Sequence, residues 1–484
     1  MSDALRQADS VIGGIPCDGR ATVVRWNPST GEPFVSIGQA TEADVARAVA
    51  AARDAAPLMG ELSPAHRATS LARAADTLST HVDEWAMDMA EEMGKPISEA
   101  LVECRRAVDV LRYHSQQVTA PLGEQFAAAA TGSPIYTLRQ PLGAVGLIAP
   151  WNFPAALPAW KLAPALAAGN STVLKLSSAG ALTGLRLVSA LLDTDLPVGA
   201  VNVLLGDDPN IGRGLVSHPD IDAVSFTGSV RVGREVIGVA SARGARVQAE
   251  MGGHAPLVVM ADAELSDAVE AAATGAFASA GQKCTSTRRA YVASSRYEEF
   301  LDGLVARVSD MSTGPARDPA TQLGPLVDAG ARDRVLGAVR EAASQGRLRF
   351  GGDVPSTPET AGGAYLTPAI VTDLPAEAPL ATREVFGPAL AVWPFDDEED
   401  PVMLANRTEY GLAAAIFTND LSVAERFVRR VDAGLVHVNS QTAGADVHVP
   451  FGGHSGSGFG TREQGREAYA FFTEDRTVYV DQAR

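Results

Sequence analysis

Residues 143–260 hold the pattern that most restricts how this chain can fold. Short apolar runs alternate there with segments of helical periodicity, and the runs are Ala144–Ala149, Thr172–Leu176, Val201–Leu205, Ala223–Phe226 and Val247–Glu250. Strands that are continuously apolar are buried on both faces, and strands that alternate with helices pair in parallel. The pattern therefore predicts βαβ units around a parallel sheet, which is an α/β fold.

The segments on either side of this block predict further elements. A second alternating block from about 262 to 440 predicts another parallel sheet, with apolar runs at Arg289–Ala293, Ala389–Trp393, Ala413–Phe417 and Leu435–Asn439. Residues 41–118 are expected to be helical, in a helix that opens with the capping box Thr41 to Asp44, one from about Ala65 to Met93, and one that carries Cys104. A last strand at Arg476–Val480 is expected to pair with Tyr136–Gln140 in a small sheet or an oligomer contact, and Gly456–Gly460 is interpreted as a loop.

Length and charge limit the kinds of partner. A chain of 484 residues exceeds one ordinary core, so at least two domains are expected. A net charge of −18 argues against nucleic acid and against an anionic membrane, because both need basic surface. The apolar stretch Pro141–Ala168 is interrupted by five prolines and is interpreted as a strand, an irregular loop and a helix rather than a membrane span.

Cysteine usage indicates a reducing environment. The three cysteines form no CxxC pair and no even framework, so we expect a cytoplasmic protein without a zinc site or other metal. The first ten residues, MSDALRQADS, lack the basic and apolar regions of a secretory signal.

Cys284 is the most distinctive candidate for chemistry. It stands in Gly-Gln-Lys-Cys-Thr, between an Ala-rich helical segment and a strand, with Lys283 beside it. A nearby cation favours the thiolate, and a glycine lets the backbone approach a ligand. These local residues leave a nucleophile and an ordinary structural thiol equally open.

Three further segments follow predicted strands, at the sheet edge where α/β proteins build their sites. Glu250 precedes two glycines and could act as a general base for water, or could simply cap a helix. The turn from Phe226 through Gly228 to Gly233 opens a helix and could bind a phosphate. Lys175 could bond ribose hydroxyls or a phosphate, or could be an ordinary surface lysine.

The loop Pro150–Pro154, of sequence PWNFP, is unusual for its aromatic residues. The side-chain amide of Asn152 could stabilise an oxyanion. Trp151 and Phe153 could exclude water from a site or could simply fill the core.

Taken together, the motifs resemble those of the aldehyde dehydrogenase superfamily, in the same order and over nearly the whole chain. They are PWNFP at 150–154, LKLSS at 174–178, FTGS at 226–229, EMGG at 250–253, GQKC at 281–284, EVFGP at 384–388 and PFGG at 450–453. The resemblance implies two Rossmann-like parallel-sheet domains, one for the cofactor and one for catalysis, with a small β-flap. It implies an NAD(P)-binding domain from 1–120 and 143–252, a catalytic domain from 253–440, and a bridging or oligomerisation segment from 121–142 and 441–484, in a homodimer or homotetramer.

The resemblance also implies a role for each matched position. Cys284 would form a thiohemiacetal and then a thioester with a small aldehyde, Glu250 would activate the hydrolytic water, and Asn152 would complete an oxyanion hole with the Cys284 backbone. Lys161 and Glu463 match positions of a proton relay. NAD or NADP would be bound by Trp151, Lys175, Ser178, Gly228, Ser229, Gly233, Gly252, Glu384 and Phe386, and the substrate pocket would be lined by Phe153, Trp160 and Phe451.

Two departures from the family pattern bear on specificity. Ser178 stands where NAD-preferring members carry a glutamate that would repel a 2′-phosphate, so NADP becomes acceptable. Trp160 stands where succinic semialdehyde dehydrogenases carry an arginine. The segments 159–170, 280–289 and 442–468 are most similar to those of α-ketoglutaric semialdehyde dehydrogenases, which implies a short oxo-acid semialdehyde as substrate.

Several alternatives remain open at this point. The substrate could be an aliphatic or aromatic aldehyde or succinic semialdehyde. The chain could be a CoA-acylating enzyme, against which Glu250 argues, because no water-activating base is needed when CoA takes the acyl group. It could also be a non-catalytic homologue, against which the joint presence of Cys284, Glu250 and Asn152 argues.

Overall fold

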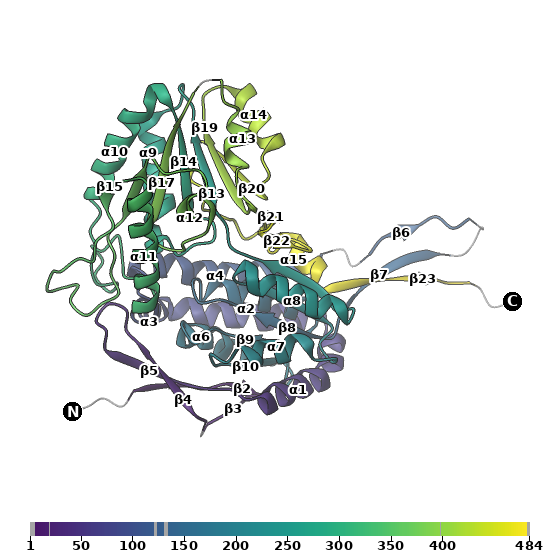
Figure 1. The fold of residues 1–484 in the computed structure, drawn as a ribbon. Helices are drawn as coiled ribbons and strands as arrows, with labels where there is room; N and C mark the ends of the chain where they lie inside the picture. Colours follow the sequence, from purple (N-terminus) through teal and green to yellow (C-terminus); the bar gives the residue numbers. More distant parts are fainter. Residues whose placement is uncertain (1–4, 19, 121–122, 130–133, 397, 482–484) are drawn as a thin grey trace.

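Two sheets flanked by helices form the body of the protein, and a narrow β-arm extends from it (Figure 1). The computed structural model describes residues 5–18, 20–120, 123–129, 134–396 and 398–481. The N-terminal residues 1–4 and positions 121–122, 130–133 and 482–484 of the predicted bridging segment lie outside the described residues.

The first sheet has eight strands in the order β22-β12-β11-β8-β9-β10-β2-β3. Strands β8 to β12 are mutually parallel, and the chain reverses its direction of strand addition between β8 and β11. Ligands of doubly wound sheets bind outside the carboxyl ends of the strands at such a reversal. The strand bounds are β2 Val11–Ile12, β3 Ile15–Pro16, β8 Ala144–Ile148, β9 Ser171–Lys175, β10 Val201–Leu204, β11 Ala223–Thr227, β12 Arg246–Glu250 and β22 Gly458–Phe459.

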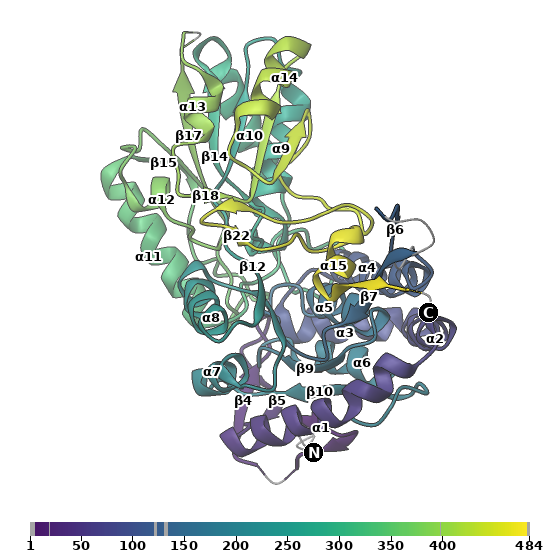
Figure 2. The ribbon, with the colours of Figure 1, turned by 90° about the vertical axis from the view of Figure 1, so that its right-hand side faces the viewer.

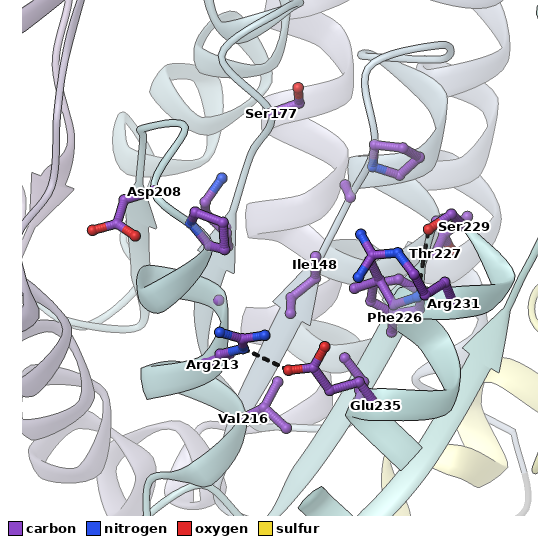
Figure 3. A pocket seen from close by; sticks show the side chains of 18 of the residues that line it. Ile148, Ser177, Asp208, Arg213, Val216, Phe226, Thr227, Ser229, Arg231 and Glu235 are labelled. Atoms are coloured by element: carbon purple, nitrogen blue, oxygen red, sulfur yellow. Dashed lines mark hydrogen bonds and ion pairs between the residues drawn. The ribbon is translucent and has the colours of Figure 1, made fainter. Parts of the chain in front are cut away.

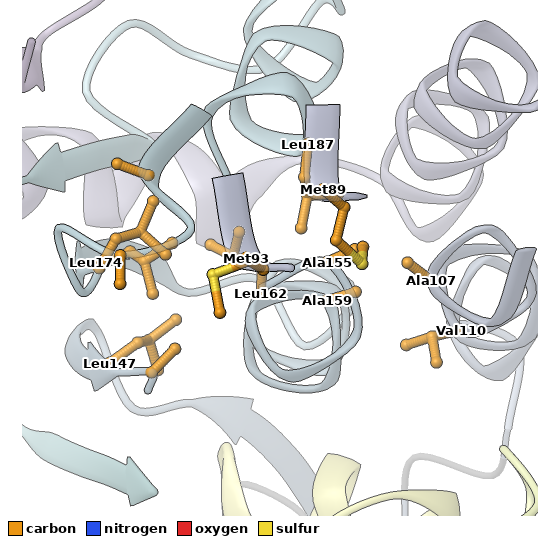
Figure 4. Close-up of a cluster of buried hydrophobic side chains, with 14 of the residues drawn as sticks. Met89, Met93, Ala107, Val110, Leu147, Ala155, Ala159, Leu162, Leu174 and Leu187 are labelled. Atoms are coloured by element: carbon orange, nitrogen blue, oxygen red, sulfur yellow. The ribbon is translucent and has the colours of Figure 1, made fainter. Parts of the chain in front are cut away.

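Helices cover both faces of this sheet because successive strand residues point to opposite sides. On one face α1, α7 and α8 pack against residues such as Val173 and Val224. On the other face α2 to α6 enclose a core in which Leu147 and Leu174 from the strands meet Met93 and Leu162 (Figure 4). The helix bounds are α1 Glu42–Glu61, α2 Pro64–Thr80, α3 Val82–Met93, α4 Ile97–Gln117, α5 Ala156–Ala167, α6 Ala181–Leu192, α7 Pro209–Ser217 and α8 Val230–Ala242.

The second sheet has seven strands in the order β15-β16-β17-β14-β13-β19-β20, of which only β15 is antiparallel to its neighbour. Its strands are β13 Ala255–Val259, β14 Thr287–Ala293, β15 Arg347–Gly351, β16 Ala369–Thr372, β17 Ala389–Phe395, β19 Ala413–Phe417 and β20 Leu435–Val438. Helices α9 (Leu265–Phe277) and α10 (Tyr297–Ser309) cover one face, and α13 (Pro401–Ala405) and α14 (Leu421–Arg430) cover the other. The two parallel sheets confirm the predicted α/β fold class.

Three smaller sheets complete the structure. The arm consists of β6 (Gln125–Phe126), β7 (Ile135–Pro141) and β23 (Thr473–Tyr479), and β23 pairs antiparallel with β7 as predicted (Figures 1 and 2). Strands β1 (Arg6–Ala8), β4 (Thr22–Trp26) and β5 (Pro33–Gly38) form a second small sheet, and β18 (Tyr410–Gly411) pairs with β21 (His454–Ser455). The remaining helices are α11 Ala329–Gln345, α12 Pro379–Thr382 and α15 Gly465–Phe471.

Two local predictions were wrong. The helix expected from Ala65 to Met93 is divided at His81, because the side chains of Thr80 and His81 both bond the Thr77 carbonyl and compete with helical bonding. The expected loop Gly456–Gly460 contains β22, which extends the first sheet by pairing antiparallel with Ala249 and Glu250. Among the described helices, none has the length and apolar character needed to cross a bilayer.

Candidate active site

Cys284 follows a tight left-handed turn that connects α9 to β14. Ser279, Ala280 and Gly281 have φ angles of 54°, 51° and 66°. Two consecutive non-glycine residues in this region store backbone strain, which the surroundings must compensate. Glu99 on α4 does so, since its carboxylate accepts a bond of 2.9 Å from the Ser279 backbone N–H and another from the Ser279 hydroxyl.

Asn152 links the PWNFP loop to the Cys284 loop. Its side-chain Nδ2 donates to the carbonyl of Gln282 at 3.0 Å, two residues before Cys284. An amide nitrogen carries two N–H groups, so one remains for another acceptor beside Cys284. The structure therefore brings together two of the residues that the sequence singled out separately.

Lys95 and Glu103 contact the PWNFP loop and the start of the helix that follows it. Neither residue was predicted from the sequence to belong to the site. The Lys95 ammonium forms a buried ion pair with Glu103, donates to the Asn152 carbonyl at 2.8 Å, and lies 3.9 Å from the centre of the Phe153 ring. The other oxygen of Glu103 accepts from the backbone N–H groups of Ala155 and Ala156 at the start of α5. A carboxylate there also complements the helix dipole.

Glu250 ends β12 and is buried. One of its oxygens accepts from the Gly453 backbone N–H at 3.0 Å, and a Cβ on Gly452 would lie 2.3 Å from the other. Gly452 of PFGG therefore leaves the space that this carboxyl occupies, and Gly453 supplies the N–H that it accepts. Burial, and next the nearby Glu463 carboxylate, raise the pKa of Glu250 well above its ordinary value.

Lys161 and Glu463 form a second buried ion pair beside Glu250. Lys161 also donates to the Ser225 hydroxyl at 2.9 Å. The Oε2 atom of Glu463 is buried and has no hydrogen-bond partner among the described residues. The structure thus places both predicted relay residues next to Glu250, in a network with a free acceptor.

Glu384 and Phe386 approach the site from the second sheet. The Glu384 carboxylate accepts from the Gly253 N–H at 3.2 Å, and a Cβ on Gly252 would lie 2.1 Å from it, so a glycine at position 252 is required for this contact. Phe386 packs edge-on against Trp151, with 5.5 Å between ring centres. Burial raises the pKa of Glu384 to about 7.

The resting thiol of Cys284 is held in its neutral form. Burial raises its pKa to about 12, and the neighbouring Glu384 and Glu250 carboxylates add to the shift. Burial also lowers the pKa of the adjacent Lys283, which weakens the support that this lysine gives to a thiolate. Burial and the two carboxylates therefore outweigh the adjacent lysine, which the sequence predicted would lower the pKa of Cys284.

A pocket of about 480 Å³ lies at the carboxyl ends of β8 and β11, where the first sheet reverses its strand order. Figure 3 shows Ser177, Phe226, Thr227 and Ser229 around it, with Arg213 and Glu235 paired across its lower part. Lys175 and Gly228 also line it, and Ser229 caps α8. A Cβ on Gly228 would lie 2.6 Å from the Phe226 ring, so glycine is required where this turn packs against that ring. The position, size and helix N-terminus fit a nucleotide.

Ser178 and Gly233, which the sequence predicts to bind the cofactor, do not line this pocket. Ser178 is fully buried, and its hydroxyl has no partner among the residues described; Ser177 lines the pocket instead. Gly233 lies inside α8, where a Cβ would meet the Met251 sulfur at 2.4 Å, so it permits close packing of the helix on β12. Lys175 lines the pocket as predicted, and burial lowers its pKa to about 8.

An aromatic pair lies near the Lys161 network. Trp160, next to Lys161 on α5, packs against Phe451 with 5.0 Å between ring centres. The Trp160 indole N–H is buried and unpartnered within the described part of the chain. No three His, Cys, Asp or Glu side chains of the described residues converge as a metal site would require.

Comparisons with known proteins agree with this geometry. The model of the aldehyde dehydrogenase family matches residues 16–478. The chain is 38% identical to an α-ketoglutaric semialdehyde dehydrogenase of Bacillus subtilis (94% of this chain and 93% of the relative covered) and 35% identical to a betaine aldehyde dehydrogenase of Vibrio vulnificus (97% of both).

Solved structures show the same fold. A structure of PnpE in complex with nicotinamide adenine dinucleotide superposes with a TM-score of 0.95 at 33% identity, over 98% of this chain and 97% of that one. An NADP-dependent enzyme of Escherichia coli superposes with a TM-score of 0.94 at 31% identity, over 100% of both chains. The chain therefore belongs to the aldehyde dehydrogenase family and is an NAD(P)-dependent oxidoreductase that acts on an aldehyde group.

Proposed function

We propose that this enzyme oxidises a short oxo-acid semialdehyde to the carboxylic acid through a thioester on Cys284 that water hydrolyses. The observation that carries the proposal is the convergence of the Asn152 amide on the Cys284 loop, with its 3.0 Å bond to the Gln282 carbonyl. The buried Glu250 carboxyl acts on the same thiol electrostatically, which supports its role as the proton acceptor.

In this mechanism the chain's own residues move two protons. Glu250 takes the proton of Cys284 while Sγ bonds to the aldehyde carbon, and the free Asn152 N–H and the Cys284 backbone N–H stabilise the oxyanion. The bound NAD(P)⁺ supplies the acceptor for the hydride that leaves this carbon. After Glu250 has passed on the proton from Cys284, it takes a proton from water, which attacks the thioester. The C–S bond then breaks, the thiolate of Cys284 takes this proton back from Glu250, and the carboxylic acid is released.

The buried Lys161–Glu463 pair lies next to Glu250 and is proposed to relay its proton away from the site. A carboxyl whose pKa is already raised by burial accepts a proton readily near neutral pH. The same residues argue against a CoA-acylating reaction, because a base with a proton exit is needed for hydrolysis and not for transfer to a thiol.

For the cofactor, we propose that the first sheet is the NAD(P)-binding domain and the second the catalytic domain, with the boundaries expected from the sequence. Lys175, Ser177 and Ser229 line the pocket at the switch of strand order and are proposed to hold the adenosine ribose and the phosphates. Glu384, braced by Gly252 and Gly253, is proposed to hold the nicotinamide ribose, with Phe386 and Trp151 beside the ring.

The assembly and compartment are also proposals. The projecting arm formed by β7 and β23 and the open edge strand β20 suit a homodimer or homotetramer, because exposed strand edges pair with another chain. Cys17, Cys104 and Cys284 are all free thiols, which suits the reducing cytoplasm.

The first prediction concerns the reactivity of Cys284 in the enzyme without cofactor. Since the pKa of the thiol is about 12, the rate of alkylation by iodoacetamide should rise about tenfold per pH unit from about pH 7 to about pH 9. Mass spectrometry of the modified peptide would give the rate, with Cys284→Ser as the control. A plateau below about pH 9 would contradict the environment described here.

The second prediction separates acylation from hydrolysis. Glu250→Gln should lower steady-state kcat by about a hundredfold to ten-thousandfold. A thioester should accumulate on Cys284, detectable by intact mass or trapping with hydroxylamine, and Cys284→Ala should form none. Wild-type enzyme given CoA should still release free acid; acyl-CoA as the product, or full turnover by Glu250→Gln, would disprove the hydrolytic route.

The third prediction concerns the substrate carboxylate, for which Arg106 on α4 is the proposed partner. Arg106 is half-buried, lies on the same face of the helix as Glu99 and Glu103, and donates to the Ala445 carbonyl in the segment that leads to Phe451. Arg106→Leu should raise KM for α-ketoglutaric semialdehyde about tenfold to a hundredfold, because a charge-assisted bond is lost. The KM for an uncharged aldehyde of similar length should change less than about twofold, and an equal effect on both would refute the assignment.

The fourth prediction concerns NADP. The pocket contains Arg213, whose guanidinium faces Glu235 (Figure 3). The residue at the position of the usual repelling glutamate is Ser178, which is buried and does not line the pocket. We expect Arg213 to bind a 2′-phosphate, so Arg213→Ala should lower kcat/KM with NADP⁺ about tenfold while changing the value with NAD⁺ less than about twofold. Arg307→Ala, which breaks a comparable surface pair with Glu270, serves as the matched control. Equal losses with both cofactors would exclude this role.

A further inference from the structure

Arg288 is a fully buried arginine that the mechanism above does not use. It lies on β14, four residues after Cys284, with only 1% of its surface exposed. A guanidinium presents five N–H donors in a fixed plane and remains charged in a protein interior, so burying one without purpose is costly. Its contacts therefore need an explanation.

The guanidinium bonds two loops that come from distant parts of the chain. One nitrogen donates to the carbonyl of Gly281, in the left-handed turn before Cys284, and the other donates to the carbonyl of Gly387 at 2.5 Å. Gly387 follows Phe386, which itself has a φ of 55° and lies two residues after Glu384. One side chain thus joins the loop that carries the nucleophile to the loop that carries Glu384.

The two loops are in direct contact at this point. A Cβ on Gly281 would lie 2.2 Å from the Gly387 carbonyl oxygen, and one on Gly387 would lie 2.4 Å from the Val335 side chain. Two carbonyl oxygens directed toward the same small region repel each other unless a shared donor lies between them. The Arg288 fork supplies that donor, which explains how this arrangement persists in a buried place.

The charges of Arg288, Glu384 and Cys284 also interact. Glu384 and Cys284 are the two acidic groups that act on the Arg288 guanidinium, while burial lowers the pKa of Arg288 to about 10. Arg288 in turn opposes the rise in the pKa of Glu384. The cation is therefore placed between the proposed ribose ligand and the proposed nucleophile.

We propose that Arg288 is a positioning residue that couples the cofactor to the nucleophile, by holding the Glu384 loop and the Cys284 loop in one register. The inference rests on the proposed roles of Cys284 and Glu384. It predicts that a cofactor bound at the Glu384 loop changes the alkylation rate of Cys284 only while the guanidinium joins the two loops.

The test measures this coupling directly, as the ratio of Cys284 alkylation rates with and without saturating NAD⁺. Wild-type enzyme should show a ratio that differs from one by about threefold or more, and Arg288→Met should bring it to about one while raising KM for NAD⁺ about tenfold. Arg288→Lys keeps the charge but cannot span both carbonyls, so its ratio should be intermediate.

The matched control is Arg289→Lys, at the adjacent buried arginine, which bonds the carbonyls of His254 and Ala405 instead of the two loops. This variant should keep the wild-type ratio, and circular dichroism and thermal unfolding should verify that all variants are folded. If Arg288→Met does not fold, the Arg288→Lys ratio decides alone.

Two outcomes would overturn the inference: a wild-type ratio of one, or an unchanged ratio in Arg288→Lys and in any folded Arg288→Met. Failure of the proposed function would look different. In that case Cys284→Ala would still reduce NAD⁺ in the presence of aldehyde, whatever the alkylation ratio of the Arg288 variants.

Discussion

One face of α4 carries the carboxylates on which the active-site geometry depends. Glu99 and Glu103 stand one helical turn apart, so they point in the same direction. Glu103 bonds the N-terminus of α5 and the ammonium of Lys95 below the PWNFP loop, and Glu99 bonds the strained turn before Cys284. A single rigid helix therefore fixes a loop of the first sheet against a loop of the second.

Buried charge is expensive, and this site contains several buried ionic groups that compensate one another. The Lys95–Glu103 and Lys161–Glu463 pairs are both nearly inaccessible to solvent. Such pairs add little net stability compared with apolar residues, but removing one partner leaves an uncompensated charge. These pairs instead fix the positions of other groups. Lys95 bonds the Asn152 carbonyl, and Lys161 and Glu463 set the charges that act on Glu250.

Local sequence patterns predicted the parallel sheets and the pairing of the two arm strands. This was possible because a buried strand is a short apolar run and a half-buried strand alternates apolar and polar residues, and both patterns involve only neighbouring residues. The meeting of Asn152 with the Cys284 loop followed from motif resemblance rather than from spacing. Lys95, Glu103 and Glu99 escaped prediction, since their partners are 57, 52 and 180 residues away and only the tertiary fold brings them together. The sequence also does not show that Ser177 lines the pocket while Ser178 is buried, because this depends on the path of the chain after β9.

The acidic, buried surroundings of Cys284 have a consequence for the survival of the enzyme. Peroxides attack thiolates, and a thiol that stays protonated is oxidised slowly to sulfenic acid. The raised pKa of Cys284 therefore slows the oxidation of this half-buried sulfur as well as its alkylation.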